Sequence, residues 1–184
     1  MVASNFPRAY DFVQVDEKGK DDDPDDRGGR TCDGITQEEF DAWCSIHKQP
    51  FGDVWDITEA TKQAIYFVNY WSPWCDRLPN AIDYLWFDVA VNSGHHEATL
   101  ILQRSLGFNS RQTDGSIGVF TAQRAVVYPD KQDLVTKFVN EHKLVYDMII
   151  KAHPTDSKYR KGWFNRIQHE LVNATAMLTD VQAS

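Results

Sequence analysis

The segment from Val15 to Thr36, VDEKGKDDDPDDRGGRTCDGIT, limits the fold of this chain more than any other. Its clustered aspartates repel one another, and its four glycines and one proline disfavour a regular helix. The sequence on both sides carries apolar residues at helical spacing. We therefore predict a small, irregular β-hairpin region beside an otherwise helical body, which is a mainly α (α+β) fold.

Two capping-box patterns mark helix starts after this acidic segment. Thr36 with Glu39, and Asp56 with Glu59, can each exchange hydrogen bonds across the first turn of a helix. Pro73 ends the second of these helices, because proline does not fit a helix interior. One earlier helix is predicted from the helical spacing of Phe6, Tyr10 and Val13.

The stretch 80–92, NAIDYLWFDVAVN, is apolar on nearly every side, which predicts the buried central helix. Its polar exceptions are Asp83, Asp88 and Asn92. Asp88 and Asn92 are four residues apart and share a helix face, so they either meet solvent or line a cleft. Further helices are predicted over residues 96–107, 133–150 and 162–178.

Composition narrows the class of protein. A chain of 184 residues suits one domain, or one domain of two lobes, and a hydrophobic content of 42% excludes global disorder. The net charge of −8 argues against nucleic acid as the main partner, since phosphate contacts need a basic face. No run of 18 apolar residues and no leader-like start occur, so we expect folding in a cytoplasm and no stable membrane insertion. Cys32, Cys44 and Cys75 are widely spaced and odd in number, which predicts free thiols.

The acidic segment does not fit the common metal-binding or nucleophilic motifs. An EF-hand loop starting at Asp21 would have Asp26 where glycine is needed and Cys32 where glutamate is needed. The stretches HHEAT and HELVN each lack the second histidine of a zinc hydrolase, and no G-x-S-x-G occurs. We therefore expect no metal site and no cofactor, although adventitious divalent binding by the carboxylates stays open.

After metal-binding and nucleophilic motifs are set aside, acid–base catalysis by carboxylate side chains is the chemistry that the segment still fits. Glu17 lies at the predicted end of an apolar helix, and Asp26 and Thr31 follow it in the acidic segment. A glycosidase needs one acid to protonate the leaving oxygen and a second group to position or activate water. Partial burial at a helix end raises a carboxyl pKa, which suits Glu17 as the acid, and the loop suits an ionised Asp26. The alternative is a solvated acidic turn without a catalytic role.

The motifs of this segment resemble those of glycoside hydrolase family 108. That family carries Glu-Gly-Gly, Asp-Pro-Gly-Gly-x-Thr and Gly-Ile-Thr at the spacing seen in EKGKDDDPDDRGGRTCDGIT. Lys18 replaces the first of these glycines and Arg27 replaces the proline. Both departures leave Glu17, Asp26 and Thr31 in place, and Lys18 beside the proposed acid leaves the pH optimum open.

The resemblance is collinear from Phe6 to Leu178, which makes it more specific than any single motif. It includes YW at 70–71, LP at 78–79, FDVAVNSG at 87–94, LQRSLG at 102–107, DGSIG at 114–118 with Thr121, and GWFNR at 162–166. The last two resemble a peptidoglycan-binding half that usually follows the catalytic one. The resemblance thus implies a catalytic half, 1–95, and a helical peptidoglycan-binding half, 96–180, packed as one lysozyme-like unit.

The activity implied by the resemblance is that of an N-acetylmuramidase, or lysozyme, which hydrolyses the β-1,4 bond between N-acetylmuramic acid and N-acetylglucosamine. Similarity to the small phage lysozymes implies a single displacement with inversion. Glu17 is then the general acid, and Asp26 and Thr31 hold the attacking water on the opposite face of the sugar.

Four residues outside the acidic segment are candidates for substrate binding. Asp88 and Asn92 are predicted to face the cleft, with Asn92 hydrogen-bonded to substrate; alternatively they satisfy the buried helix. Trp163 and Arg166 lie on the last predicted helix, and in similar phage lysozymes an arginine there pairs with the catalytic glutamate, here Glu17. The alternative is an ordinary core tryptophan and a solvated arginine.

The expected partner is bacterial peptidoglycan, and the enzyme is expected to be a monomer. Because this polymer is anionic, a local basic patch is expected, with Lys18, Lys20, Arg27, Arg30 and Arg166 as candidates. The simplest setting is a phage endolysin that waits in the host cytoplasm and reaches the cell wall through a holin. A lytic transglycosylase, a non-catalytic wall-binding protein, and a tail-associated or secretion-linked muramidase remain as alternatives.

Overall fold

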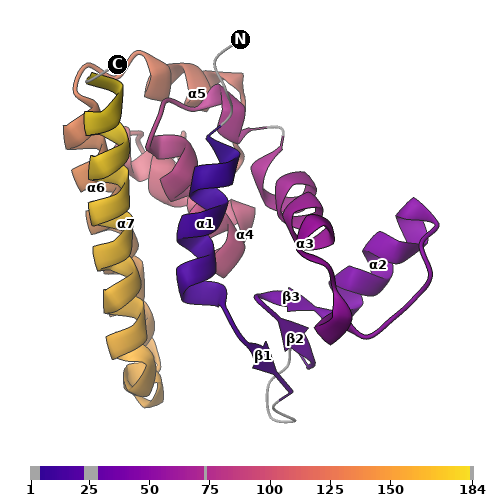
Figure 1. Ribbon diagram of the computed structural model, residues 1–184. Helices are drawn as coiled ribbons and strands as arrows, with labels where there is room; N and C mark the ends of the chain where they lie inside the picture. The colour runs from indigo at the N-terminus through magenta and orange to yellow at the C-terminus, as the bar shows by residue number, and fades with distance from the viewer. Residues whose placement is uncertain (1–4, 23–28, 73, 183–184) are drawn as a thin grey trace. The chain divides into compact units, whose positions relative to one another are not determined.

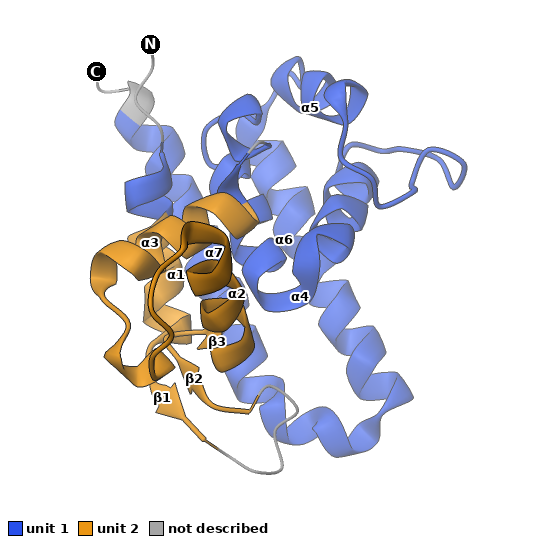
Figure 2. Ribbon diagram, turned by 90° about the vertical axis from the view of Figure 1, so that its right-hand side faces the viewer, with its two compact units in different colours: residues 1–9, 71–184 blue, residues 10–70 orange. Residues whose placement is uncertain are grey.

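The computed structural model describes residues 5–22, 29–72 and 74–182 of the chain. These residues form a mainly α fold with one small three-stranded antiparallel sheet, as predicted (Figure 1). The chain divides into two compact units, which are coloured separately in Figure 2. Unit 1 comprises residues 1–9 and 71–184, and unit 2 comprises residues 10–70.

Unit 2 contains the acidic segment and the elements around it. Helix α1 runs over Phe6–Glu17 and contributes its first turn to unit 1 and the rest to unit 2. The elements that follow are β1 (Lys20–Asp21), β2 (Thr31–Cys32), β3 (Ile35–Thr36), α2 (Gln37–His47), the 3-10 turn η1 (Val54–Asp56), α3 (Glu59–Tyr66) and the π-helical turn η2 (Phe67–Trp71).

The sheet of unit 2 has the strand order β1-β2-β3, with neighbouring strands antiparallel. Thr31 lies opposite Asp21 on one side and Thr36 on the other. Cys32 and Ile35 face each other and are buried, so the turn that joins β2 to β3 is fixed by packing as well as by pairing. The predicted hairpin region is therefore confirmed over the described part of the acidic segment.

Capping explains where α2 begins. Thr36 accepts a hydrogen bond from the Glu39 backbone N–H at 3.1 Å, and Glu39 Oε2 accepts one from the Thr36 N–H at 3.2 Å. This is the predicted capping box. The second predicted box is wrong, because Asp56 belongs to η1 and α3 is capped by Thr58, which accepts from the Thr61 N–H at 3.2 Å.

Unit 1 is built from longer helices. Its elements, in chain order, are the short 3-10 turn η3 (Cys75–Arg77), α4 (Ile82–Ser105), α5 (Val119–Val126), α6 (Lys131–Ala152), the 3-10 segment η4 (Pro154–Tyr159) and α7 (Arg160–Gln182). Helix α4 leaves helical geometry at Gly94, whose φ of 84° favours glycine. This break separates the two helices that the sequence predicts over 80–92 and 96–107, and the predicted helices over 133–150 and 162–178 are confirmed as α6 and α7.

The first half of α4 forms the core of unit 1, as its all-round apolar pattern predicts. Every residue from Ile82 to Ala90 is buried, including the polar Asp83 and Asp88. Helices α6 and α7 both pack on α4 and on each other. Phe6 from the first turn of α1 adds edge-on contacts with Trp71 and Phe87, at ring-centroid distances of 5.6 and 6.0 Å.

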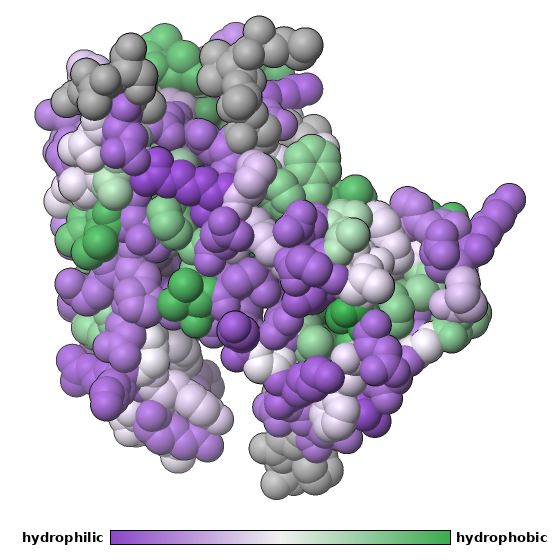
Figure 3. Space-filling model, viewed as in Figure 1, coloured by the Kyte–Doolittle hydropathy of each residue, from purple (hydrophilic) through white to green (hydrophobic). Residues whose placement is uncertain are grey.

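The three cysteines are buried free thiols, as predicted. Figure 3 shows a mainly hydrophilic face on which hydrophobic residues are scattered. Among the helices of residues 5–22, 29–72 and 74–182, none has the length and apolarity that crossing a membrane requires.

Two buried groups of unit 1 have opposite effects on stability as the pH changes. Burial lowers the pKa of His142 from 6.5 to about 4. The contribution of His142 to the free energy of unfolding is therefore complete above pH 6.5 and is lost as the pH falls toward 4. Burial raises the pKa of Asp83 from 3.8 to about 6, although Asn5 and the Tyr84 N–H donate hydrogen bonds to it. The Asp83 contribution is therefore present below pH 3.8 and is lost as the pH rises through 6. In the wild type the two largely cancel.

Asp83→Asn removes the opposing titration, so we expect it to make the pH dependence that His142 gives to the free energy of unfolding measurable. The free energy of unfolding of this variant should fall by about 3 kcal/mol between pH 6.5 and pH 4, as a pKa difference of that size implies. His142→Gln should show the opposite slope, with stability falling as the pH rises from 4 to 6. Urea unfolding at half-unit pH steps measures both, and parallel curves for the two variants would contradict the expectation.

Candidate active site

Glu17 is the last residue of α1 and is half-buried. Its side chain lies against Gly34 in the turn between β2 and β3: a Cβ added at Gly34 would be 3.1 Å from Glu17 Oε2 and 3.3 Å from Glu17 Cβ. The same Cβ would be 2.5 Å from the Tyr66 hydroxyl. Gly34 also has a φ of 79°, which favours glycine. Glycine at this position therefore lets the helix end and the hairpin turn approach closely.

Two tyrosines of unit 2 lie near the Glu17 carboxylate. Burial, followed by the charge of Glu17, raises the pKa of Tyr66 well above its ordinary value. Burial also raises the pKa of Tyr70, where the charges of Glu39 and Glu17 add to the effect. Tyr66 donates to the Asp33 carbonyl at 2.8 Å and Tyr70 donates to Glu39 Oε1 at 2.7 Å. Both phenols therefore stay protonated hydrogen-bond donors beside the candidate acid.

Thr31 lies on β2, two residues before the turn that Glu17 contacts. Its carbonyl accepts a hydrogen bond from Trp55 Nε1 at 2.9 Å. Arg30 stacks on the Trp55 ring at 3.7 Å and forms an ion pair with Asp53 at 2.9 Å. These contacts hold β2 against η1, so the position of Thr31 is set from outside the sheet as well as within it.

Asp26, the second predicted catalytic carboxylate, lies outside the described residues, and so does Arg27. Of the predicted basic patch, Lys18 and Lys20 are exposed, and the Lys20 ammonium lies 5.6 Å from the centre of the Trp55 ring. Arg166 is 6% exposed, so it does not contribute to a surface patch.

Asp88 and Arg166 form a buried ion pair in unit 1. Arg166 Nε donates to Asp88 Oδ2 at 3.0 Å and Arg166 Nη2 donates to Oδ1 at 3.1 Å. Burial opposes ionisation of Asp88, but the charge and hydrogen bonds of Arg166 hold its pKa below the ordinary value. A second buried contact, His142 Nδ1 with Glu170 Oε1 at 2.7 Å, joins α6 to α7. The Asp88 carboxylate thus has its hydrogen-bond partners in the interior of unit 1, which is the alternative considered for it. Its contact with substrate stays a prediction.

Asn92 and Trp163 are joined through a residue that the sequence did not single out. Tyr146 donates to Asn92 Oδ1 at 2.9 Å and stacks on Trp163 at 4.9 Å with an interplanar angle of 7°. Asn92 is exposed and Trp163 half-exposed, so both present atoms to solvent. The signal for Tyr146 was its place on the α6 apolar stripe four residues after His142, which by itself indicates only a core residue.

The predicted site residues are therefore divided between the units. Glu17 and Thr31 belong to unit 2, whereas Asp88, Asn92, Trp163 and Arg166 belong to unit 1. The predicted pairing of Arg166 with Glu17 stays a prediction. In the described part of the chain, no group of three or more histidine, cysteine or acidic side chains is arranged to hold a metal ion.

The half-buried Glu17 thus ends a helix against a small β-hairpin, within a mainly α, lysozyme-like fold. Comparison with family models agrees. Residues 10–94 match glycosyl hydrolase 108, and residues 97–168 match the predicted peptidoglycan domain. The first matched region is therefore a glycosyl hydrolase 108 region, and the second is a predicted peptidoglycan domain. Together the two families make it a glycoside hydrolase that acts on peptidoglycan.

Among solved structures, this chain is similar to the one described as "Structure of Brucella abortus SagA". The identity is 29%, the TM-score is 0.75, and the match covers 94% of this chain and 95% of that chain. Comparison with curated protein sequences gives no match. The two family regions meet between residues 94 and 97, whereas the compact units divide the chain at 9/10 and 70/71. The predicted halves 1–95 and 96–180 stay a prediction.

Proposed function

We propose that the protein is an N-acetylmuramidase that hydrolyses the β-1,4 bond between N-acetylmuramic acid and N-acetylglucosamine with inversion. The observation that carries this proposal is the close approach of the Glu17 side chain to Gly34, two residues after the β2 strand that holds Thr31. This approach puts a carboxyl group at the end of a helix next to the strand that carries a second candidate catalytic side chain.

The proposed reaction is a single displacement. Glu17 donates its proton to the glycosidic oxygen, and the bond between that oxygen and C1 of N-acetylmuramic acid breaks. Asp26 and Thr31 hold a water on the opposite face of the sugar, and Asp26 accepts its proton as the oxygen attacks C1. The products are a new reducing N-acetylmuramic acid end of inverted configuration and an N-acetylglucosamine with a free 4-hydroxyl group.

Analysis of digestion products tests the reaction. Purified peptidoglycan is incubated with the protein, reduced with borohydride and analysed by mass spectrometry, with early samples followed by NMR for the anomer. We expect reduced muramic acid ends and the α-anomer first. Anhydro-muramic acid ends would indicate a lytic transglycosylase, reduced glucosamine ends would indicate cleavage of the other glycosidic bond, and no new ends would indicate a wall-binding protein without activity.

For the biological setting we propose a monomeric phage endolysin that accumulates in the host cytoplasm and is released to the cell wall by a holin. The proposal is supported by the combination of a glycosyl hydrolase region with a predicted peptidoglycan domain in one short chain. Expression of the protein in a bacterial host with and without a holin tests it. Lysis that requires the holin is expected, and lysis without one, or a stable oligomer in analytical ultracentrifugation, would contradict the respective part of the proposal.

A further inference from the structure

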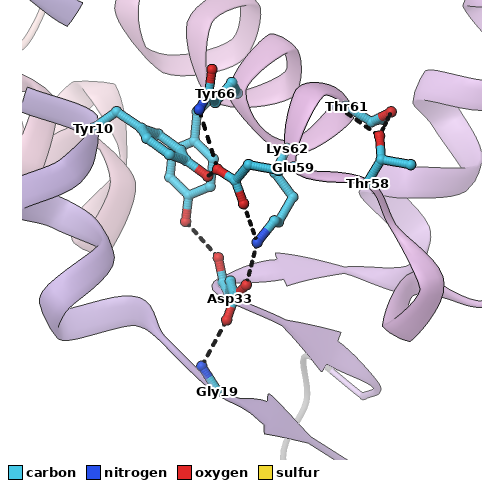
Figure 4. Close-up of polar contacts among 9 residues, drawn as sticks. Tyr10, Gly19, Asp33, Thr58, Glu59, Thr61, Lys62 and Tyr66 are labelled. Atoms are coloured by element: carbon cyan, nitrogen blue, oxygen red, sulfur yellow. Dashed lines mark hydrogen bonds and ion pairs between the residues drawn. The ribbon is translucent and has the colours of Figure 1, made fainter. Parts of the chain in front are cut away.

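Asp33, in the turn between β2 and β3, forms polar contacts with two other segments of unit 2 (Figure 4). Its backbone N–H donates to the Gly19 carbonyl at 2.7 Å, and its Oδ1 accepts from the Gly19 N–H at 2.9 Å. Its carbonyl accepts from the Tyr66 hydroxyl at 2.8 Å, and its Oδ2 accepts from Lys62 Nζ at 2.5 Å. Asp33 thus ties the chain just after α1 to the turn, and ties the turn to α3.

Lys62 extends this connection back to α1. Its ammonium group contacts Glu59 Oε2 at 2.7 Å as well as Asp33, and Glu59 Oε1 accepts from the Tyr10 hydroxyl at 2.7 Å. The Lys62 and Asp33 side chains are only 12% and 16% exposed, so water screens their attraction weakly. Burial opposes both charges, but the hydrogen bond between them lowers the pKa of Asp33 and raises that of Lys62. The pair therefore stays ionised across the neutral range.

The position of this pair relates it to the candidate acid. Gly19, which Asp33 binds twice, is two residues after Glu17. Gly34, which follows Asp33, is the residue that the Glu17 side chain contacts. Thr31 is two residues before Asp33 on β2. The backbone and carboxylate of Asp33 together thus connect the segment that follows Glu17 and helix α3 to the turn that continues β2, the strand that carries Thr31.

We propose that the Asp33–Lys62 ion pair is a positioning device that sets the separation of Glu17 from Thr31 and thereby the rate of the glycosidic step. This inference rests on the proposed muramidase function. Neither residue is assigned to contact the substrate, so its removal should lower kcat and leave KM nearly unchanged. A displacement of about 1 Å in a reacting geometry costs about 100-fold in rate.

Two substitutions isolate the pair. Asp33→Asn keeps an acceptor for the Gly19 N–H and suits the positive φ of 49° at this position, but removes the charge that holds Lys62. Lys62→Met keeps the apolar stem and removes the ammonium group. We expect each to lower kcat by about 10- to 100-fold on soluble peptidoglycan glycan strands, with KM within threefold. The double variant should lose no more than either single variant, because both remove the same contact.

Controls separate positioning from general stability. Lys62→Arg restores a cation and should recover most of kcat. Lys143→Met removes an ion pair with Asp147 of similar length, 2.7 Å, on the surface of α6, and should leave kcat unchanged. Rates are normalised to the folded fraction from circular dichroism.

The outcomes distinguish the two proposals. A wild-type protein that forms no new muramic acid ends would overturn the proposed function and this inference with it. A wild-type protein that is active, with Asp33→Asn and Lys62→Met both within threefold of its kcat, would overturn the positioning role alone. Loss of kcat in Lys62→Met that Lys62→Arg does not restore would also overturn it.

Discussion

Glu17→Gln is expected to lower muramidase turnover by about two to four orders of magnitude, because it removes the proton that the leaving oxygen must receive. Glutamine has nearly the same size as glutamate, so its side chain can occupy the same space against Gly34. The fold of unit 2 should therefore persist. Initial rates of new reducing ends on soluble glycan strands measure the effect, and thermal unfolding checks the fold.

A matched control is available in the same unit. Glu38 lies exposed in the first turn of α2, and Glu38→Gln makes the same chemical change away from the hairpin turn. We expect this variant to keep wild-type turnover. A Glu17→Gln protein that is folded and hydrolyses glycan at the wild-type rate would remove Glu17 from the role of general acid.

Arg166→Met is expected to lower the free energy of unfolding by about 3–5 kcal/mol, because it leaves the buried Asp88 carboxylate without the two N–H groups that stabilise its charge. Replacing both partners, with Asp88→Leu and Arg166→Met, should restore a large part of the loss, since no charge is then left buried. Urea unfolding at pH 7 measures the free energy of unfolding of the wild type, of Arg166→Met and of the double variant.

A surface pair provides the comparison for this effect. Arg8 and Asp180 form an ion pair of 2.7 Å with side chains 39% and 64% exposed. Arg8→Met should change the unfolding free energy by less than about 1 kcal/mol, because exposed pairs contribute little. If Arg166→Met were as mild as Arg8→Met, the Asp88–Arg166 contact would not be a major source of stability in unit 1.

The sequence predicted those parts of the fold that depend on local rules. The acidic segment is rich in glycine and like charges, so a hairpin region was the expected outcome, and Thr36 with Glu39 meets every requirement of a capping box. The Asp56 box failed because Thr58, two positions further on, is also a residue type that caps helices. Thr58 caps α3, whereas Asp56 is held in the turn whose start Asp53 caps.

The polar contacts of the candidate site were harder to predict, because they join residues that are distant along the chain. Asp33 and Lys62 are 29 positions apart, and Arg166 and Asp88 are 78 positions apart. No periodicity or spacing relates the members of such pairs. The sequence could name Glu17 from its motif, but the side chains that surround it follow from packing alone.

The close approach at Gly34 has a consequence for judging other chains of this kind. The Glu17 side chain lies in the space that a side chain at position 34 would need. The acid at position 17 therefore favours glycine 17 positions later in the chain. A relative that keeps the acid but has a larger residue at the glycine position would have to move the Tyr66 hydroxyl and shift the carboxylate by a few tenths of an ångström, and we expect it to be a less active enzyme. The glycine is therefore a second diagnostic residue, readable from sequence, for separating active hydrolases from inactive descendants.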